Sequence, residues 1–188
     1  MYISFEQYYL KLNSWKDEDE MRNYLNSFDE SALVLGKSEY SGSSHHTITI
    51  FSNEIEHGIG ISTDFGSIKP SILLDKSRLN IILGFGQSVY FIHIPRNQII
   101  ARFTIDSIFY QFLTFFNIGT SDFFWAVHEI GIVAYSFDGK EKWQHSFNDI
   151  ITKLDVEQNT VLLRLMESPN DQIVVDIESG KPTIKNNS

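Results

Sequence analysis

The first 30 residues place apolar side chains at helical spacing. Two runs follow the i, i+3, i+4, i+7 pattern of an amphipathic helix: Phe5, Tyr8, Tyr9 and Leu12, and then Met21, Tyr24, Leu25 and Phe28. Ser4 before Gln7, and Asp17 before Glu20, have the spacing of helix capping residues. We therefore predict a helical pair within residues 1–30 that packs an aromatic face on a larger domain.

From Ala32 onward the apolar positions alternate with period two, which indicates half-buried strands. The segments 47–51, 99–105 and 161–165 show the alternation, and turn residues recur between such runs. Asp138-Gly139 is the strongest turn signal and predicts a two-residue hairpin loop with positive φ. Residues 31–188 are therefore expected to form one mainly β domain, an antiparallel meander of one or two curved sheets.

The segment 106–119 fits two structures. It could be a helix capped by Asp106 and ended by Gly119. Its many phenylalanines, with Tyr110, favour a strand instead. We predict a strand.

Part of the β region repeats at an interval of roughly 40 residues, the spacing of a β-propeller blade. Residues 89–100 align with 132–143, and these align in turn with 174–181. The segments 134–143 and 175–181 resemble the hairpins of quinoprotein-type propeller blades. Residues 32–188 hold at most about three to four such units, whereas propellers usually have roughly four to eight blades. The resemblance therefore implies propeller-like hairpins in an open arrangement and not a closed ring.

Composition narrows function mainly by exclusion. The formal net charge is −9, which argues against a nucleic-acid partner and favours a basic protein partner. The absence of cysteine excludes a disulfide scaffold, a thiolate zinc site and a cysteine nucleophile. No apolar run approaches the roughly 20 residues of a membrane-spanning helix, and Glu6 interrupts any leader-like segment. We expect a cytoplasmic protein that has no cofactor and does not bind membranes.

Glycine-containing motifs point to structure here and not to phosphate chemistry. Gly36-Lys37-Ser38 follows an apolar run as a phosphate-binding loop would, but Ser31 stands where that motif needs its first glycine. We interpret Gly36 as a strand end. Gly60 within a predicted strand indicates a bulge or a close backbone approach.

The histidines are the candidates for metal or acid–base chemistry. His45 and His46 are adjacent, so on a strand they point to opposite faces. His57 could approach one of them across a hairpin, where Glu54 or Glu56 would complete a zinc site. The alternative is an ordinary polar loop that enters a strand.

His128 and Glu129 form a separate acid–base candidate at a strand end. No nucleophile motif accompanies these residues. The sequence therefore names no complete catalytic set.

In overall character the chain resembles bacterial immunity proteins, which are small, acidic, cysteine-free and without a catalytic signature. The resemblance implies a non-enzymatic protein that binds and neutralises a cognate toxin, often a basic nuclease. The predicted contact residues are exposed acids: Asp17, Glu18, Asp19, Glu20, Glu54 and Glu56. One alternative is an enzyme or small-ligand binder that uses His57, His128 and Glu129 at the mouth of the sheet. Another is a scaffold module from a propeller-like repeat family.

Overall fold

The computed structural model describes residues 2–28, 32–37, 39, 42–52, 56–64, 68–115, 122–168 and 171–186. The chain divides into two compact units, Met1–Phe103 and Thr104–Ser188. Glu54 and residues 116–120, which include the end of the predicted 106–119 strand, lie outside the described residues.

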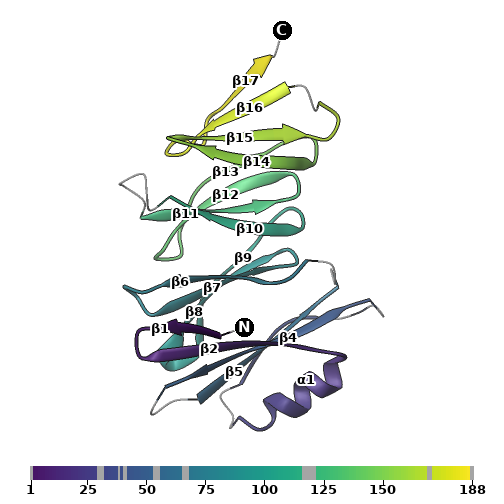
Figure 1. The fold of residues 1–188 in the computed structure, drawn as a ribbon, viewed down its shortest axis with the longest axis vertical. Coiled ribbons are helices and arrows are strands. Elements are labelled where there is room, and N and C mark those ends of the chain that lie inside the picture. The colour runs from purple at the N-terminus through teal and green to yellow at the C-terminus, as the bar shows by residue number, and fades with distance from the viewer. Residues whose placement is uncertain are drawn as a thin grey trace. The chain divides into compact units, whose positions relative to one another are not determined.

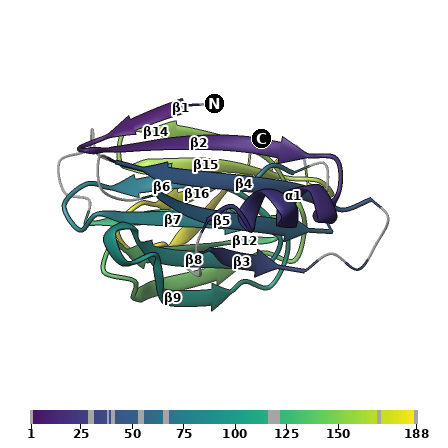
Figure 2. The same cartoon turned by 90° about the horizontal axis from the view of Figure 1, so that it is seen from below.

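Unit 1 contains two sheets (Figures 1 and 2). The first has five strands in the order β1-β2-β4-β5-β3: β1 (Tyr2–Phe5), β2 (Tyr8–Trp15), β4 (Ser44–Phe51), β5 (Glu56–Thr63) and β3 (Leu33–Gly36). The second has four strands in chain order: β6 (Ser71–Asp75), β7 (Asn80–Phe85), β8 (Ser88–His93) and β9 (Gln98–Thr104), with a short 3-10 helix, Ile94–Arg96, before the last. Strand β3 runs parallel to β5, an exception to the predicted antiparallel arrangement.

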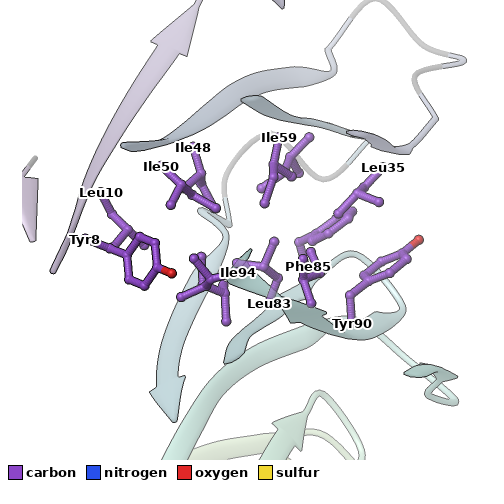
Figure 3. Close-up of a cluster of buried hydrophobic side chains, with 13 residues drawn as sticks. Tyr8, Leu10, Leu35, Ile48, Ile50, Ile59, Leu83, Phe85, Tyr90 and Ile94 are labelled. Carbon is purple, nitrogen blue, oxygen red and sulfur yellow. The ribbon is translucent and has the colours of Figure 1, made fainter. Parts of the chain in front are cut away.

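One hydrophobic cluster takes side chains from both sheets of unit 1 (Figure 3). The first sheet contributes alternate residues of its strands, such as Ile48 and Ile50 of β4. The second contributes Ile81 and Leu83 of β7. These four side chains are fully buried, and for Ile48 and Ile50 the period-two pattern of residues 47–51 identifies the inward-facing positions.

Of the two helices predicted within residues 1–30, the second is confirmed and the first is wrong. The helix α1 (Glu18–Leu25) forms as expected, and Asp17 caps it by accepting a hydrogen bond from the Glu20 backbone N–H at 2.9 Å. The predicted first helix is instead the hairpin β1–β2, whose strands pair at Phe5 and Tyr8 across a two-residue loop. Glu6 in that loop has a φ of 52°.

Helix α1 packs on the first sheet, at a place where β5 has two glycines, Gly58 and Gly60. Met21, Leu25 and Phe28 form the buried face of the helix segment. A Cβ at Gly60 of β5 would lie 2.4 Å from Cδ1 of Leu25, and one at Gly58 would lie 2.9 Å from Cδ2 of the same side chain. The predicted close approach at Gly60 is made by the Leu25 and Met21 side chains of α1 and not by another backbone segment.

Unit 2 contains two four-stranded antiparallel sheets, each in chain order. The strands of the first are β10 (Phe109–Thr114), β11 (Phe123–His128), β12 (Gly131–Ser136) and β13 (Glu141–Ser146). Those of the second are β14 (Ile151–Glu157), β15 (Thr160–Leu165), β16 (Asp171–Asp176) and β17 (Pro182–Asn186). A second hydrophobic cluster joins the two sheets. Within the described part of 106–119, the predicted strand is confirmed as β10.

The repeated hairpins occupy equivalent places in three sheets. Residues 89–100, 132–143 and 174–181 contain the turns between the third and fourth strands of their sheets, β8–β9, β12–β13 and β16–β17. The chain thus uses consecutive four-stranded antiparallel sheets, the unit from which propeller blades are built. The described strands form four sheets, however, and not the one or two that the sequence suggested.

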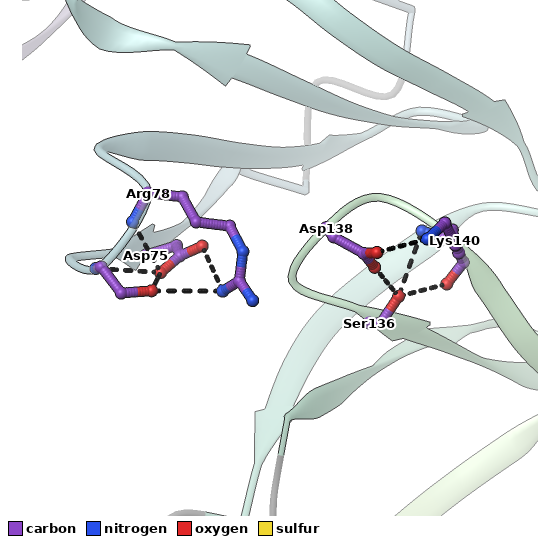
Figure 4. Close-up of polar contacts among 6 residues, drawn as sticks. Asp75, Arg78, Ser136, Asp138 and Lys140 are labelled. Carbon is purple, nitrogen blue, oxygen red and sulfur yellow. Dashed lines mark hydrogen bonds and ion pairs between the residues drawn. The ribbon is translucent and has the colours of Figure 1, made fainter.

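The turns depend on polar side chains as well as on glycine (Figure 4). At Asp138-Gly139 only Gly139 has positive φ, so the predicted two-residue loop is wrong. A longer turn forms, in which the Ser136 backbone N–H donates to the Lys140 carbonyl oxygen at 2.8 Å. In the β6–β7 turn Asp75 accepts hydrogen bonds from the Ser77 backbone N–H and hydroxyl, at 3.1 and 2.8 Å.

Candidate functional site

A pocket of about 420 Å³ opens in unit 1, at one end of its hydrophobic cluster. Its wall comes from β3, the end of β5, the β7–β8 turn, β8 and β9. Both β3 and β9 are edge strands, each with a single neighbour in its sheet. The pocket therefore lies between two open sheet edges.

Two aromatic rings form the buried side of the pocket. Phe85 and Tyr90 stack with their ring centroids 5.3 Å apart and an interplanar angle of 9° (Figure 3). Tyr90 is 3% exposed, and its hydroxyl makes no hydrogen bond with any described residue. The Arg102 guanidinium lies 5.2 Å from the centroid of the Tyr90 ring, a cation–π contact that holds it at the pocket. The pocket thus carries a hydroxyl without a partner among the described residues, beside an exposed cation that lies against the Tyr90 ring.

The charges that line the pocket sum to one positive charge. Lys37 and Arg102 are the cations, and within the described part of the chain neither forms an ion pair. Among the described residues that line the pocket, Asp64 is the single acid. Its carboxylate accepts hydrogen bonds from the Ser43 hydroxyl at 2.7 Å and from the Glu39 backbone N–H at 2.9 Å. The pocket is therefore a positively charged site on a chain with a net charge of −9.

Gly36 shapes the pocket at the end of β3. Its φ is +78°, and a Cβ there would lie 2.1 Å from the Ser62 carbonyl oxygen. Only glycine fits this position, because both the backbone conformation and the space exclude a side chain. The interpretation of Gly36 as a strand end is confirmed, while Ser38 of the same motif lies outside the described residues.

The acidic turn, residues 17–20, lies at the N-terminus of α1 and has structural roles of its own. Asp17 caps the helix, and Glu18 accepts a hydrogen bond from Arg22 at 2.7 Å. The Glu20 carboxylate accepts one from the Lys16 backbone N–H at 3.4 Å. Asp19 is exposed and makes no hydrogen bond or ion pair with any described residue. Acids here also interact favourably with the helix dipole.

The structure does not bring Glu56 to the acidic turn. Glu56 is exposed at the start of β5. Trp15, which precedes the helix, pairs with His45, and His45 pairs with Ser62 near the other end of β5. Six residues of strand separate Ser62 from Glu56, about 20 Å at the usual rise. Glu54, the last predicted contact residue, lies outside the described residues.

The histidines of the predicted zinc site are not brought together. His45 and His46 bond to serines on different neighbouring strands. Nδ1 of His45 lies 3.2 Å from the Ser62 hydroxyl of β5, and Nδ1 of His46 lies 3.0 Å from the Ser14 hydroxyl of β2. His57 pairs with Ile50, four residues along β4 from His46, about 13 Å. The described residues contain no group of three or more side chains that could hold a metal ion. Burial, with lesser effects of His45 and Lys69, lowers the pKa of His46.

His128 is fully buried and bonded to a serine that the sequence did not indicate. The Ser107 hydroxyl accepts a hydrogen bond from the Ile130 backbone N–H at 3.2 Å, and it lies 2.7 Å from Nδ1 of His128. Either atom can donate in this contact, because the hydroxyl oxygen can accept from the Ile130 N–H and from the ring at the same time. Burial lowers the pKa of His128. A base with no exposed surface cannot reach a substrate, so this pair is a structural contact, and Glu129 gains no catalytic partner from it.

Sequence reasoning missed the pocket itself. Lys37 stood in a motif that was considered for phosphate, but nothing marked Tyr90 or Arg102. These two residues meet only because β8 and β9 pair as neighbours, so no local spacing could reveal them. No helix of the described chain is long and apolar enough to cross a membrane.

The comparisons with known proteins concern the fold alone. No protein-family model and no curated protein matches the chain. Among solved structures it is similar to the β-propeller domain of Cps50 (Swd1) from Myceliophteria thermophila, at 9% identity and a TM-score of 0.47, over 62% of this chain and 36% of that one. It is also similar to the WD40 domain of Pan2 from Neurospora crassa, at 12% identity and a TM-score of 0.47, over 65% and 40%. The chain spans less than half the length of either domain chain.

Proposed function

We propose that this protein is a non-enzymatic protein-binding module whose partner carries a basic surface. The observation that carries the proposal is the acidic turn, which presents exposed Asp19 and Glu20 from a helix whose other face is buried. Because Met21 and Leu25 fix the helix to the sheet, the charges are held in place before a partner arrives. Such preorganised charge accelerates encounter with an opposite surface.

The narrower function is that of an immunity protein, which neutralises a basic, nuclease-type toxin by covering its active site. What supports it is the net charge of −9 and the placement of the acidic turn on a docked helix. A toxin domain encoded directly upstream of this gene would favour the narrower function, and its absence would weaken it.

The first step of the test is to capture the partner from the native host and identify it by mass spectrometry. The partner is then purified, and its association rate is measured by stopped flow with Asp19→Lys. Asp19 is the right position because the other acids of the turn cap the helix or bond to neighbours. We expect association to slow about tenfold at low salt, with a smaller effect at high salt.

Glu157→Lys is the matched control, since it makes the same change in charge at an exposed position of unit 2. Its association rate should stay close to that of the unchanged protein. Equal rates for the two variants, or no partner in repeated captures, would contradict the proposal.

A further inference from the structure

We propose that the pocket between β3 and β9 binds a small organic acid, a single carboxylate carried on an apolar group. The proposal stands on three features of the pocket: its two cations without an ion-pair partner among the described residues, the Tyr90 hydroxyl, and its apolar rim. It does not depend on the partner proposed above, because the acidic turn does not line this pocket.

The polar end of the pocket is suited to one carboxylate. Arg102 is fixed over the Tyr90 ring and makes no ion pair with a described residue, so its guanidinium N–H groups remain for a ligand. Tyr90 lines the same pocket, so its hydroxyl is a donor in addition to the Arg102 guanidinium and the Lys37 ammonium group. The hydroxyl oxygen is open to solvent, so a ligand oxygen could take the place of water there.

The charge of the site favours a monoanion over a dianion. Lys37 and Arg102 face a single lining acid, Asp64, so the pocket has one excess positive charge. A carboxylate neutralises that excess. A phosphate dianion would carry more negative charge than this excess, and the Asp64 carboxylate would repel it.

The remaining lining is apolar and accounts for the second part of the ligand. Val34 and Ile99, from the two edge strands, line the pocket and are 42% and 38% exposed overall. Phe85 and Leu35 lie on the buried side. A volume of about 420 Å³ is within the range of small-molecule sites. Burial of an aliphatic group against these residues would add affinity that a bare carboxylate lacks.

The test is a titration of the full chain, labelled with nitrogen-15, followed by NMR. The probes are N-acetyl-leucine, its neutral amide N-acetyl-leucinamide, sodium acetate and inorganic phosphate. We expect N-acetyl-leucine to bind about tenfold more tightly than the neutral amide, because the acid alone makes charge-assisted hydrogen bonds. N-acetyl-leucine should also bind more tightly than acetate and phosphate. The amide signals that shift should come from β3, β8 and β9.

Three variants locate the site. Tyr90→Phe keeps the ring and removes only the hydroxyl, and Arg102→Gln removes the fixed cation; each should weaken binding of N-acetyl-leucine by about fivefold to tenfold. Arg96→Gln removes an exposed cation that does not line the pocket, so it should leave binding unchanged. Unchanged amide spectra outside the pocket would show that the variants fold.

Four outcomes would overturn the proposal: equal affinity for the acid and the amide, no binding of either up to about 20 mM, tighter binding of phosphate, or signals that shift away from the pocket. A tetrapeptide that ends in leucine then identifies the source of the carboxylate. Tighter binding than N-acetyl-leucine supports a peptide C-terminus that also pairs with an edge strand. Equal binding supports a free small acid.

Discussion

The turn between β16 and β17 gives a prediction whose size follows from geometry. Gly180 has a φ of +67°, and a Cβ at this position would lie 2.5 Å from Cδ2 of Trp143. The Trp143 ring is held in place because its indole N–H donates to the Glu178 carbonyl oxygen at 3.1 Å. Gly180→Ala therefore meets two separate obstacles, an unfavourable backbone conformation and a ring that cannot easily move away.

The expected loss in free energy of unfolding is about 1.5–4.5 kcal/mol. Alanine in the left-handed region costs about 1–2 kcal/mol relative to glycine. Overpacking against the ring costs about 1–3 kcal/mol. The lower entropy of the unfolded alanine chain offsets about 0.5 kcal/mol of this sum.

Urea unfolding followed by circular dichroism and tryptophan fluorescence measures the loss. In a Trp143→Leu background the same substitution should cost only about 1 kcal/mol, since the backbone term alone remains. Gly42→Ala is the control, because nothing lies within 4 Å of a Cβ there and its φ is not positive. A Gly180→Ala variant within about 0.5 kcal/mol of the unchanged protein would refute the reasoning.

Three further predictions concern the helix cap and the buried histidines. Asp17→Ala should lower the free energy of unfolding by about 1 kcal/mol, because the Glu20 N–H loses its acceptor; urea unfolding measures the loss, and Asp17→Asn should restore most of it. Ser107→Ala should cost about 2–4 kcal/mol in the same assay, because a buried ring nitrogen of His128 and a backbone N–H lose their partner; a loss below about 0.5 kcal/mol would contradict this. Burial lowers the folded-state pKa of His46 and of His128, so the unfolded chain binds more protons. Stability should therefore be full above about pH 6.5 and fall as the pH drops below that value; urea midpoints that stay constant from neutral to acidic pH would argue against it.

The strands could largely be predicted from sequence because alternation reflects a simple geometric fact. Ile48 and Ile50 point to the same face of β4 and are fully buried, as their spacing indicates. The intervening Thr47 and Thr49 were expected on the polar face, yet they are buried too. Trp15 and Tyr24 bond to these two threonines, so the helix segment covers a face that alternation alone marks as open.

The N-terminal hairpin could not be predicted because two periodicities coincide there. Tyr8 and Leu12 fit a helical stripe, but Tyr8 and Leu10 also fit a strand, and these last two are the buried pair. The loop at Glu6 has positive φ without a glycine or asparagine, so no turn residue announces it. Packing against the rest of the sheet decides between the two patterns, and local sequence does not contain that information.

The candidate site lay further beyond the reach of sequence. Its parts come from β3, β8 and β9, which are distant along the chain and meet through sheet pairing and core formation. An arginine near a tyrosine has no characteristic spacing when the two lie on neighbouring strands. The acidic turn, by contrast, was visible at once because its residues are contiguous.

The glycines beneath α1 bear on how a protein of this kind can grow by duplication. Proteins built from repeated sheets lengthen when a copied sheet stacks on an exposed apolar face. At Gly58 and Gly60 that face has no side chains of its own, and Leu25 and Phe28 of the helix segment fill the space. A copied sheet would find no side chains to pack against at these two positions, and the helix segment would occupy the space. A sheet added on this side of unit 1 would therefore have to displace helix α1 from Gly58 and Gly60.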